Sequence, residues 1–293
     1  MPKRPPKRHH YVPQMLQKRF VDENGDIHYF DKSESEKGVQ RTKPKKLLMQ
    51  LHLYSTESAS GVKDATLENE YSALENATDP LIGEMLEIID EGRYPKLSAS
   101  AHELWATFVY HQWRRTPDMQ SRIMSPSNAL AIIETGLKDI EEKNGKPLDR
   151  EVREKFLDPK YVTRFHQNAR VKALRRQSPE ILGMLKAKGL FFGHCSCKDG
   201  FILGSSPIIK IGRVGSELSD PAVEVWLPIS PHVCAVLGGA PNDGQLVWMT
   251  RPQVRKINLI IETNSSVFAG NSRSQIESIV SRLTIHQSAP SVG

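Results

Sequence analysis

Two adjacent histidines near the start of the chain are the first residues that could do chemistry. His9 and His10 precede Tyr11-Val12-Pro13, and Gln14 follows the proline. A neutral imidazole can bind a metal or act as a general base, because its unperturbed pKa of about 6.5 permits proton transfer near neutral pH. The structural alternative is that His10 and Gln14 hydrogen-bond to backbone and tie this segment to the core. We predict that His10 and Gln14 form one wall of a reaction site, with His9 as a substrate contact.

Two carboxylates with helical spacing are the next candidates. Glu68 and Glu75 are seven residues apart, so on a helix they share a face about 10 Å apart along the axis. Glu75 could hold a divalent cation or orient a histidine, although acidic helix faces are more often simply solvated. We predict His10 and Glu75 as ligands of a divalent cation, Mg or Mn.

A glutamine and an arginine in a later segment could complete the site. Gln112 and Arg115 are three apart and therefore lie on one helical face. Arginine can bind a phosphate through two parallel hydrogen bonds, and glutamine can orient a water. The competing structural interpretation is an ion pair between neighbouring helices, from Arg115 to Glu75 or Glu68.

Three further residues are predicted substrate contacts. Lys45 lies in a basic stretch, Ser206 lies in a turn at a predicted strand end, and Asn258 follows the last predicted strand. Other chemistries have less support. Asn24 and His28 are too close together to complete a nuclease site of the HNH kind. P-loop, dinucleotide-binding and Gly-x-Ser-x-Gly motifs are absent from the sequence.

Three cysteines give no disulfide framework. Cys195-Ser196-Cys197 beside His194 makes a zinc site conceivable, but a closed structural site needs four ligands at suitable spacing. We interpret Cys195, Cys197 and Cys234 as reduced cysteines in or near strands.

Composition and charge limit the function classes. The 293 residues carry a net charge of +6 and are 38% hydrophobic, as in a globular protein that could bind nucleic acid or a nucleotide. No apolar run approaches the 20 or so residues that span a bilayer, so no membrane partner is expected. The N-terminal stretch is basic and proline-rich rather than apolar, which predicts a cytoplasmic protein.

The elements that must position these residues indicate an α+β fold. We expect a disordered basic arm over residues 1–8, followed by an extended N-terminal segment and a hairpin with a strand near 27–30. A helical region over about 60–188 should pack on a β-rich, mostly antiparallel region over about 189–287. The segment 256–261 fits either strand or helix. Helices are predicted near 65–90, 98–115, 128–143, 150–156, 160–175, 180–188 and 272–283, and strands near 190–192, 201–203, 208–211, 223–227, 233–237 and 245–248.

Several of these motifs together resemble a bacterial family known as DUF4238. The similarity lies in residues 10–14, in Glu68 and Glu75, in residues 112–117 and in residues 228–231. It covers nearly the whole chain, which implies one domain over about 9–287. Members usually carry a Ser-Asp-Asn-Pro-like turn, whereas this chain reads Gly204-Ser205-Ser206-Pro207 and lacks the acidic residue. The resemblance implies a shared fold and no particular activity.

Three functions follow from these patterns. The first is a nuclease-like phosphodiester hydrolase that uses His10, Gln14, Glu75, Gln112 and Arg115, with a divalent cation, on nucleic acid. The second is a non-catalytic module that binds nucleic acid or a nucleotide. The third is a structural or interaction protein whose polar motifs only fix the fold.

Overall fold

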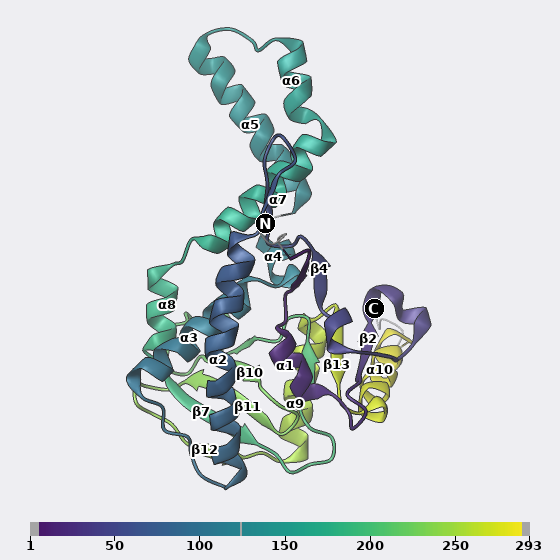
Figure 1. Ribbon diagram of the computed structural model, residues 1–293, viewed down its shortest axis with the longest axis vertical. Helices are drawn as coiled ribbons and strands as arrows, with labels where there is room; N and C mark the ends of the chain where they lie inside the picture. The colour runs from purple at the N-terminus through teal and green to yellow at the C-terminus, as the bar shows by residue number, and fades with distance from the viewer. Residues whose placement is uncertain (1–5, 124, 289–293) are drawn as a thin grey trace, which may run out of the picture. The chain divides into compact units, whose positions relative to one another are not determined.

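The computed structural model describes residues 6–123 and 125–288, and the chain divides into two compact units. Unit 1 contains Met1–His9, Gln50–Ser72 and Met119–Gln177, and unit 2 contains His10–Met49, Ala73–Asp118 and Ser178–Gly293. Each unit is therefore assembled from segments that are far apart in sequence (Figure 1). The two units are described separately, and the single domain expected over 9–287 stays a prediction.

Unit 1 is mainly helical. It holds a small antiparallel ribbon of β5 (Thr56–Glu57) and β6 (Lys63–Asp64), together with α5 (Pro126–Asn144), α6 (Arg150–Leu157) and α7 (Pro159–Arg175). Both α5 and α7 begin with proline at a position where the missing N–H is not needed. The side chain of the residue before each proline caps the first turn, so the three helices predicted in this region are confirmed.

Unit 2 contains two larger sheets. The first has the strand order β12-β7-β11-β10-β9 and is antiparallel except for the parallel pair of β12 with β7. The second has the order β3-β2-β13-β8 and is antiparallel throughout. Their bounds are β2 (Ile27–Asp31), β3 (Gln40–Thr42), β7 (Gly189–His194), β8 (Leu203–Gly204), β9 (Ile209–Ile211), β10 (Glu224–Pro228), β11 (Val233–Gly238), β12 (Leu246–Trp248) and β13 (Val267–Gly270).

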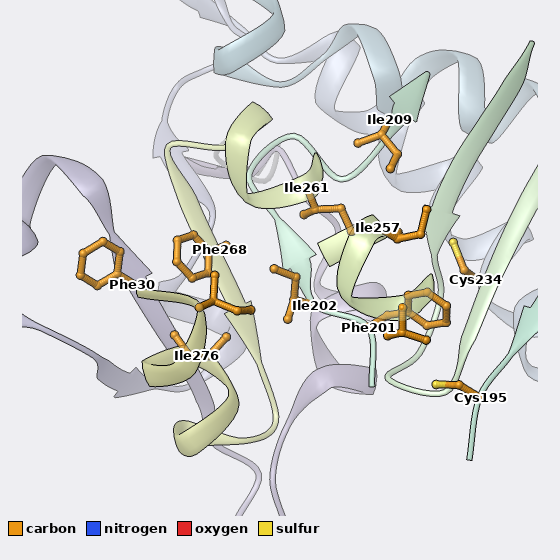
Figure 2. Packing of buried hydrophobic residues seen from close by; sticks show 12 residues of the cluster. Phe30, Cys195, Phe201, Ile202, Ile209, Cys234, Ile257, Ile261, Phe268 and Ile276 are labelled. Atoms are coloured by element: carbon orange, nitrogen blue, oxygen red, sulfur yellow. The ribbon is translucent and has the colours of Figure 1, made fainter. Parts of the chain in front are cut away.

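The helix α9 (Arg251–Asn264) packs against strands of both sheets in unit 2. Figure 2 shows Ile257 and Ile261 of this helix between Cys234 and Ile209 of one sheet and Phe268 of the other. All five side chains are almost completely buried, and together they form part of one apolar cluster. The 256–261 segment, which fitted strand or helix, is therefore helical because one of its faces is needed for this core.

The remaining elements belong to one of the two units or run through both. Ser98 accepts a hydrogen bond from the Ala101 N–H and so caps α3. Arg8 lies in a strand and the Lys7 carbonyl accepts from the His52 N–H, so the disordered arm predicted over 1–8 is wrong for these two residues. Residues 1–5 of that prediction lie outside the described residues. These elements are β1 (Arg8–His10), α1 (Gln14–Gln17), β4 (Met49–Leu51), α2 (Thr66–Asp90), α3 (Ala99–Arg114), α4 (Pro117–Ile123), α8 (Pro179–Lys186), α10 (Arg273–Ser288) and the 3-10 turns Lys18–Phe20, Lys32–Lys37 and Pro44–Lys46.

The fold class predicted from sequence is confirmed: helices dominate the middle of the chain and most sheet strands lie towards its C-terminus. Within residues 6–123 and 125–288, no helix is both long enough and apolar enough to cross a membrane.

Candidate functional site

The N-terminal motif enters unit 2 as a tightly held bend. Pro13 ends the extended stretch and starts α1, because its fixed φ suits the position before a helix. The Tyr11 N–H donates to the Leu48 carbonyl at 3.0 Å. The buried Gln17 amide donates to the carbonyls of Val12 and Leu47 at 2.7 and 3.1 Å. The segment is thus tied to the core largely through its backbone.

His10 and Gln14 lie next to each other at this bend. Gln14 Nε2 is 3.5 Å from His10 Nδ1, which is a long contact, and both side chains are partly exposed. The amide nitrogen can only donate, so Nδ1 accepts and the proton of a neutral ring lies on Nε2. Gln17 and Tyr11 also tie this segment to the core, a role that the structural interpretation gave to His10 and Gln14.

Helices α2 and α3 bring the other predicted residues together. Arg115 follows the last turn of α3, and its Nη1 donates to Glu75 Oε1 at 2.8 Å. Its Nε donates to Gln112 Oε1, also at 2.8 Å. Gln112 Nε2 in turn donates to the Tyr11 carbonyl at 2.8 Å, one residue after His10. A continuous polar chain therefore links Glu75 to the N-terminal motif.

Burial distinguishes the members of this chain. The side chains of Gln112 and Arg115 are 1% and 2% exposed, whereas that of Glu75 is 23% exposed. The ion pair between Arg115 and Glu75, the structural alternative to a catalytic role, is present. The nitrogen and the oxygen of the Gln112 amide are both hydrogen-bonded. Gln112 and Arg115 can therefore position other groups. Solvent reaches Glu75, whereas His10 is exposed only in part and its Nε2 is buried.

A carboxylate that the sequence prediction missed lies in the same unit. Asp118, three residues after Arg115, accepts hydrogen bonds from the Ser205 hydroxyl and, at 3.2 Å, from the Ser266 N–H. Burial, and then the negative charges of Asp118 and Asp31, raise the pKa of Tyr11 well above its ordinary value. The turn that lacks its own acidic residue is thus in contact with an acidic residue from another segment.

His111, the neighbour of Gln112, has a strongly perturbed pKa. Burial, and then the positive charges of Arg114 and Arg115, lower the pKa of His111 to about 4. The ring lies edge-on to Tyr110, with centroids 5.1 Å apart. His111 is therefore neutral in the folded protein near neutral pH.

Acidification should reveal this neutral histidine. His111 takes up a proton near pH 6.5 in the unfolded chain and only near pH 4 in the folded chain. The free energy of unfolding is therefore unaffected by this group above pH 6.5 and decreases as the pH falls from 6.5 towards 4. From pH 7.5 to 5.0 the wild type should lose about 1.5 kcal/mol more than His111→Gln, after allowance for partial exposure of the ring. Urea unfolding at both pH values measures this difference, and equal losses in the two proteins would contradict it.

His9 belongs to unit 1 and is fully engaged there. Its Nδ1 accepts the Tyr54 N–H at 2.9 Å, and its Nε2 lies 2.9 Å from the Pro6 carbonyl. Burial lowers the pKa of His9, so the ring is neutral and the 3.8 Å approach of Glu68 is no ion pair. With both nitrogens occupied, His9 serves as a packing residue, stacked on Tyr54.

The other predicted substrate contacts do not join the Arg115 network through any hydrogen bond seen among the described residues. Asn258 is buried in α9 and binds the Gly200 carbonyl and the Ile202 N–H. Ser206 is buried and its N–H donates to Ser265. Lys45 is exposed in a 3-10 turn. Asn258 therefore fixes local backbone, and the backbone of Ser206 is itself held by the Ser265 hydroxyl.

The predicted metal ligands do not form part of a larger cluster. In the part of the chain that the structure describes, no three histidine, cysteine, aspartate or glutamate side chains are grouped to hold a metal. The three cysteines are free, as predicted, and burial raises the pKa of the Cys195 thiol to about 12. A cation at His10 and Glu75 would take the rest of its ligands from water or substrate.

Comparison with known proteins gives one result. Searches of curated proteins and of solved structures gave no match to the chain. A family model described as "Protein of unknown function (DUF4238)" matches residues 8–275, which include the N-terminal motif and the Arg115 network. The chain therefore belongs to the DUF4238 family.

Proposed function

We propose that the chain is a nuclease-like phosphodiester hydrolase acting on nucleic acid. One observation carries this proposal: three separate segments of unit 2, residues 10–14, Glu75 and residues 112–115, meet through consecutive hydrogen bonds. Two members of this group, Glu75 and the partly exposed His10, are less buried than Gln112 and Arg115, which hold Glu75 and the backbone next to His10. This division between reacting and positioning groups is what a preorganised site requires.

His10 is the general base in this scheme. Water adds to the phosphorus, and one of its protons passes to Nδ1 of His10, the ring nitrogen without a proton, whose long contact with Gln14 opens. The bond from phosphorus to the leaving ester oxygen breaks, and solvent protonates that oxygen. Glu75, held by Arg115, orients the histidine or binds a divalent cation, Mg or Mn. Gln112 and Arg115 act as positioning residues because they are too buried to touch a polymer. A cytoplasmic location belongs to the same proposal.

Incubation of the purified full-length chain with end-labelled RNA and with single- and double-stranded DNA tests the proposal. Each substrate is incubated with Mg²⁺, with Mn²⁺ and with EDTA. Shorter products are expected with a cation and should disappear in EDTA. No product from any substrate under any condition would contradict the hydrolase.

The structural alternative has a specific observation in its favour. Both sides of the Gln112 amide and two nitrogens of Arg115 are bound to protein groups. On this alternative the network only clamps the N-terminal motif to α2 and α3, and variants would change stability alone. The non-catalytic binding alternative loses Arg115 as a phosphate contact, because the guanidinium is 2% exposed. It keeps exposed lysines such as Lys45 and Lys46.

A further inference from the structure

A pocket in unit 1 lies outside the network described above. Its volume is about 490 Å³, and its walls come from the turn after β4, from the β5–β6 ribbon and from the first turns of α7. The polar side chains that face it include His52, Ser55, Lys63, Lys160, Arg164 and Gln167. All of them belong to one compact unit.

The turn that forms one wall is held rigidly by α7. Gln167 Nε2 lies within 3.1 Å of three carbonyl oxygens, those of His52, Leu53 and Ser55. Arg170 donates to the Leu53 carbonyl at 2.8 Å and to Gln167 Oε1 at 2.5 Å. Because these carbonyls are bound to α7, the turn is fixed before any ligand arrives.

Two polar atoms in this wall have no hydrogen-bond partner in the described protein. The Ser55 hydroxyl is one: the residue is 3% exposed, and its Oγ is buried and unpaired. The other is Nδ1 of His52, a residue that also has the positive φ of 55° that non-glycine residues rarely adopt. A buried hydroxyl without a partner is costly, so it indicates a group that binds there.

The charges that face the pocket are mostly positive. Lys63, Lys160 and Arg164 line it, and Glu57, 3.6 Å from Lys63, is the one carboxylate among the described lining residues. Burial, and then the charges of Lys63 and Lys7, lower the pKa of His52. The N-terminus of α7 does not add to this charge, because the Asp158 carboxylate caps it by accepting from the N–H groups of Lys160 and Tyr161.

We propose that this pocket binds a phosphomonoester group, as carried by a nucleotide or by the phosphorylated end of a nucleic acid. The Ser55 hydroxyl donates to one phosphoryl oxygen, and the cations of Lys160, Arg164 and Lys63 balance the double negative charge. A ligand with a single carboxylate carries one negative charge, which would balance the three positive charges less well than a phosphomonoester does. The volume leaves room for a nucleoside beside the phosphate. The site does not depend on the hydrolase activity proposed for unit 2.

Calorimetric titration of the full-length chain tests the site with inorganic phosphate, AMP and a tetranucleotide that carries either a 5′-phosphate or a 5′-hydroxyl. The phosphate-bearing probes should bind to the wild type, and Arg164→Gln should lower their affinity at least tenfold. Lys172→Gln, an exposed change on the same helix, should leave binding unaltered. Preference for AMP identifies a free nucleotide, and equal binding of the 5′-phosphorylated tetranucleotide identifies a nucleic-acid end.

Ser55→Ala separates binding from folding. Because its Oγ has no protein partner, the variant should melt no lower than the wild type while binding AMP about fivefold more weakly or worse. Three results would each overturn the proposal. They are a wild type that does not bind AMP, a Lys172→Gln variant that binds it as weakly as Arg164→Gln does, and a Ser55→Ala variant that binds it with unchanged affinity. Failure of nucleic-acid cleavage would leave it intact, because these titrations measure binding alone.

Discussion

Arg115→Met is expected to lower the free energy of unfolding by about 3 kcal/mol, because it breaks a largely buried ion pair and leaves its partners unsatisfied. Gln112 loses the donor to its Oε1, and Glu75 loses its buried counter-charge. The value falls at the lower end of the range for buried pairs, since Glu75 is 23% exposed and water can solvate it.

The matched control for this variant is a second arginine–glutamate pair, between Arg175 of α7 and Glu70 of α2. Arg175 and Glu70 lie 3.2 Å apart, but their side chains are 48% and 49% exposed. Arg175→Met should therefore cost no more than about 0.5 kcal/mol. Urea unfolding of both variants at one pH and ionic strength measures the contrast. Equal losses would mean that the Arg115 network contributes no more than a surface pair.

His10→Ala is expected to slow nucleic-acid cleavage by about 10²–10⁴-fold, the usual contribution of a general base. His10 immediately precedes Tyr11, whose carbonyl ends the polar chain that starts at Glu75, and the residue is partly exposed. Gln14→Ala should slow cleavage less than His10→Ala does, because the contact between Gln14 Nε2 and His10 Nδ1 is long, at 3.5 Å. His102→Ala, on α3, is a suitable control because this histidine lies outside the network.

The helices were the most predictable part of this chain. The positions of α2 and α3 followed from the helical spacing of apolar residues such as Leu67, Tyr71 and Trp105, and Ser98 or Ser100 was the expected cap of α3. These signals are local, so a sequence contains them directly.

Pairings between distant segments were not predictable in the same way. The strand β13, which was not predicted, lies between β2 and β8, and β12 pairs in parallel with β7. Such pairings depend on long-range packing that periodicity does not encode. The segment 256–261 was ambiguous for the same reason: only the two sheets around α9 decide that it is a helix.

The candidate site was partly predictable. Residue types and spacing indicated His10, Glu75, Gln112 and Arg115, and the ion pair of Arg115 with Glu75 was one of the stated alternatives. Sequence could not give the depth of burial, which makes Arg115 a positioning residue rather than a phosphate contact. It also could not show that Asp118 would meet Ser205 across 87 residues of chain.

The rate of cleavage of an end-labelled RNA by the wild type, His10→Ala and His102→Ala, with Mg²⁺ or Mn²⁺ present, tests the central claim most directly. Each rate is divided by the fraction folded, taken from urea unfolding of the same preparation, so that loss of structure is not counted as loss of activity. The proposed hydrolase predicts cation-dependent cleavage that falls at least 100-fold in His10→Ala and is unchanged in His102→Ala. Cleavage at the wild-type rate by folded His10→Ala would contradict it.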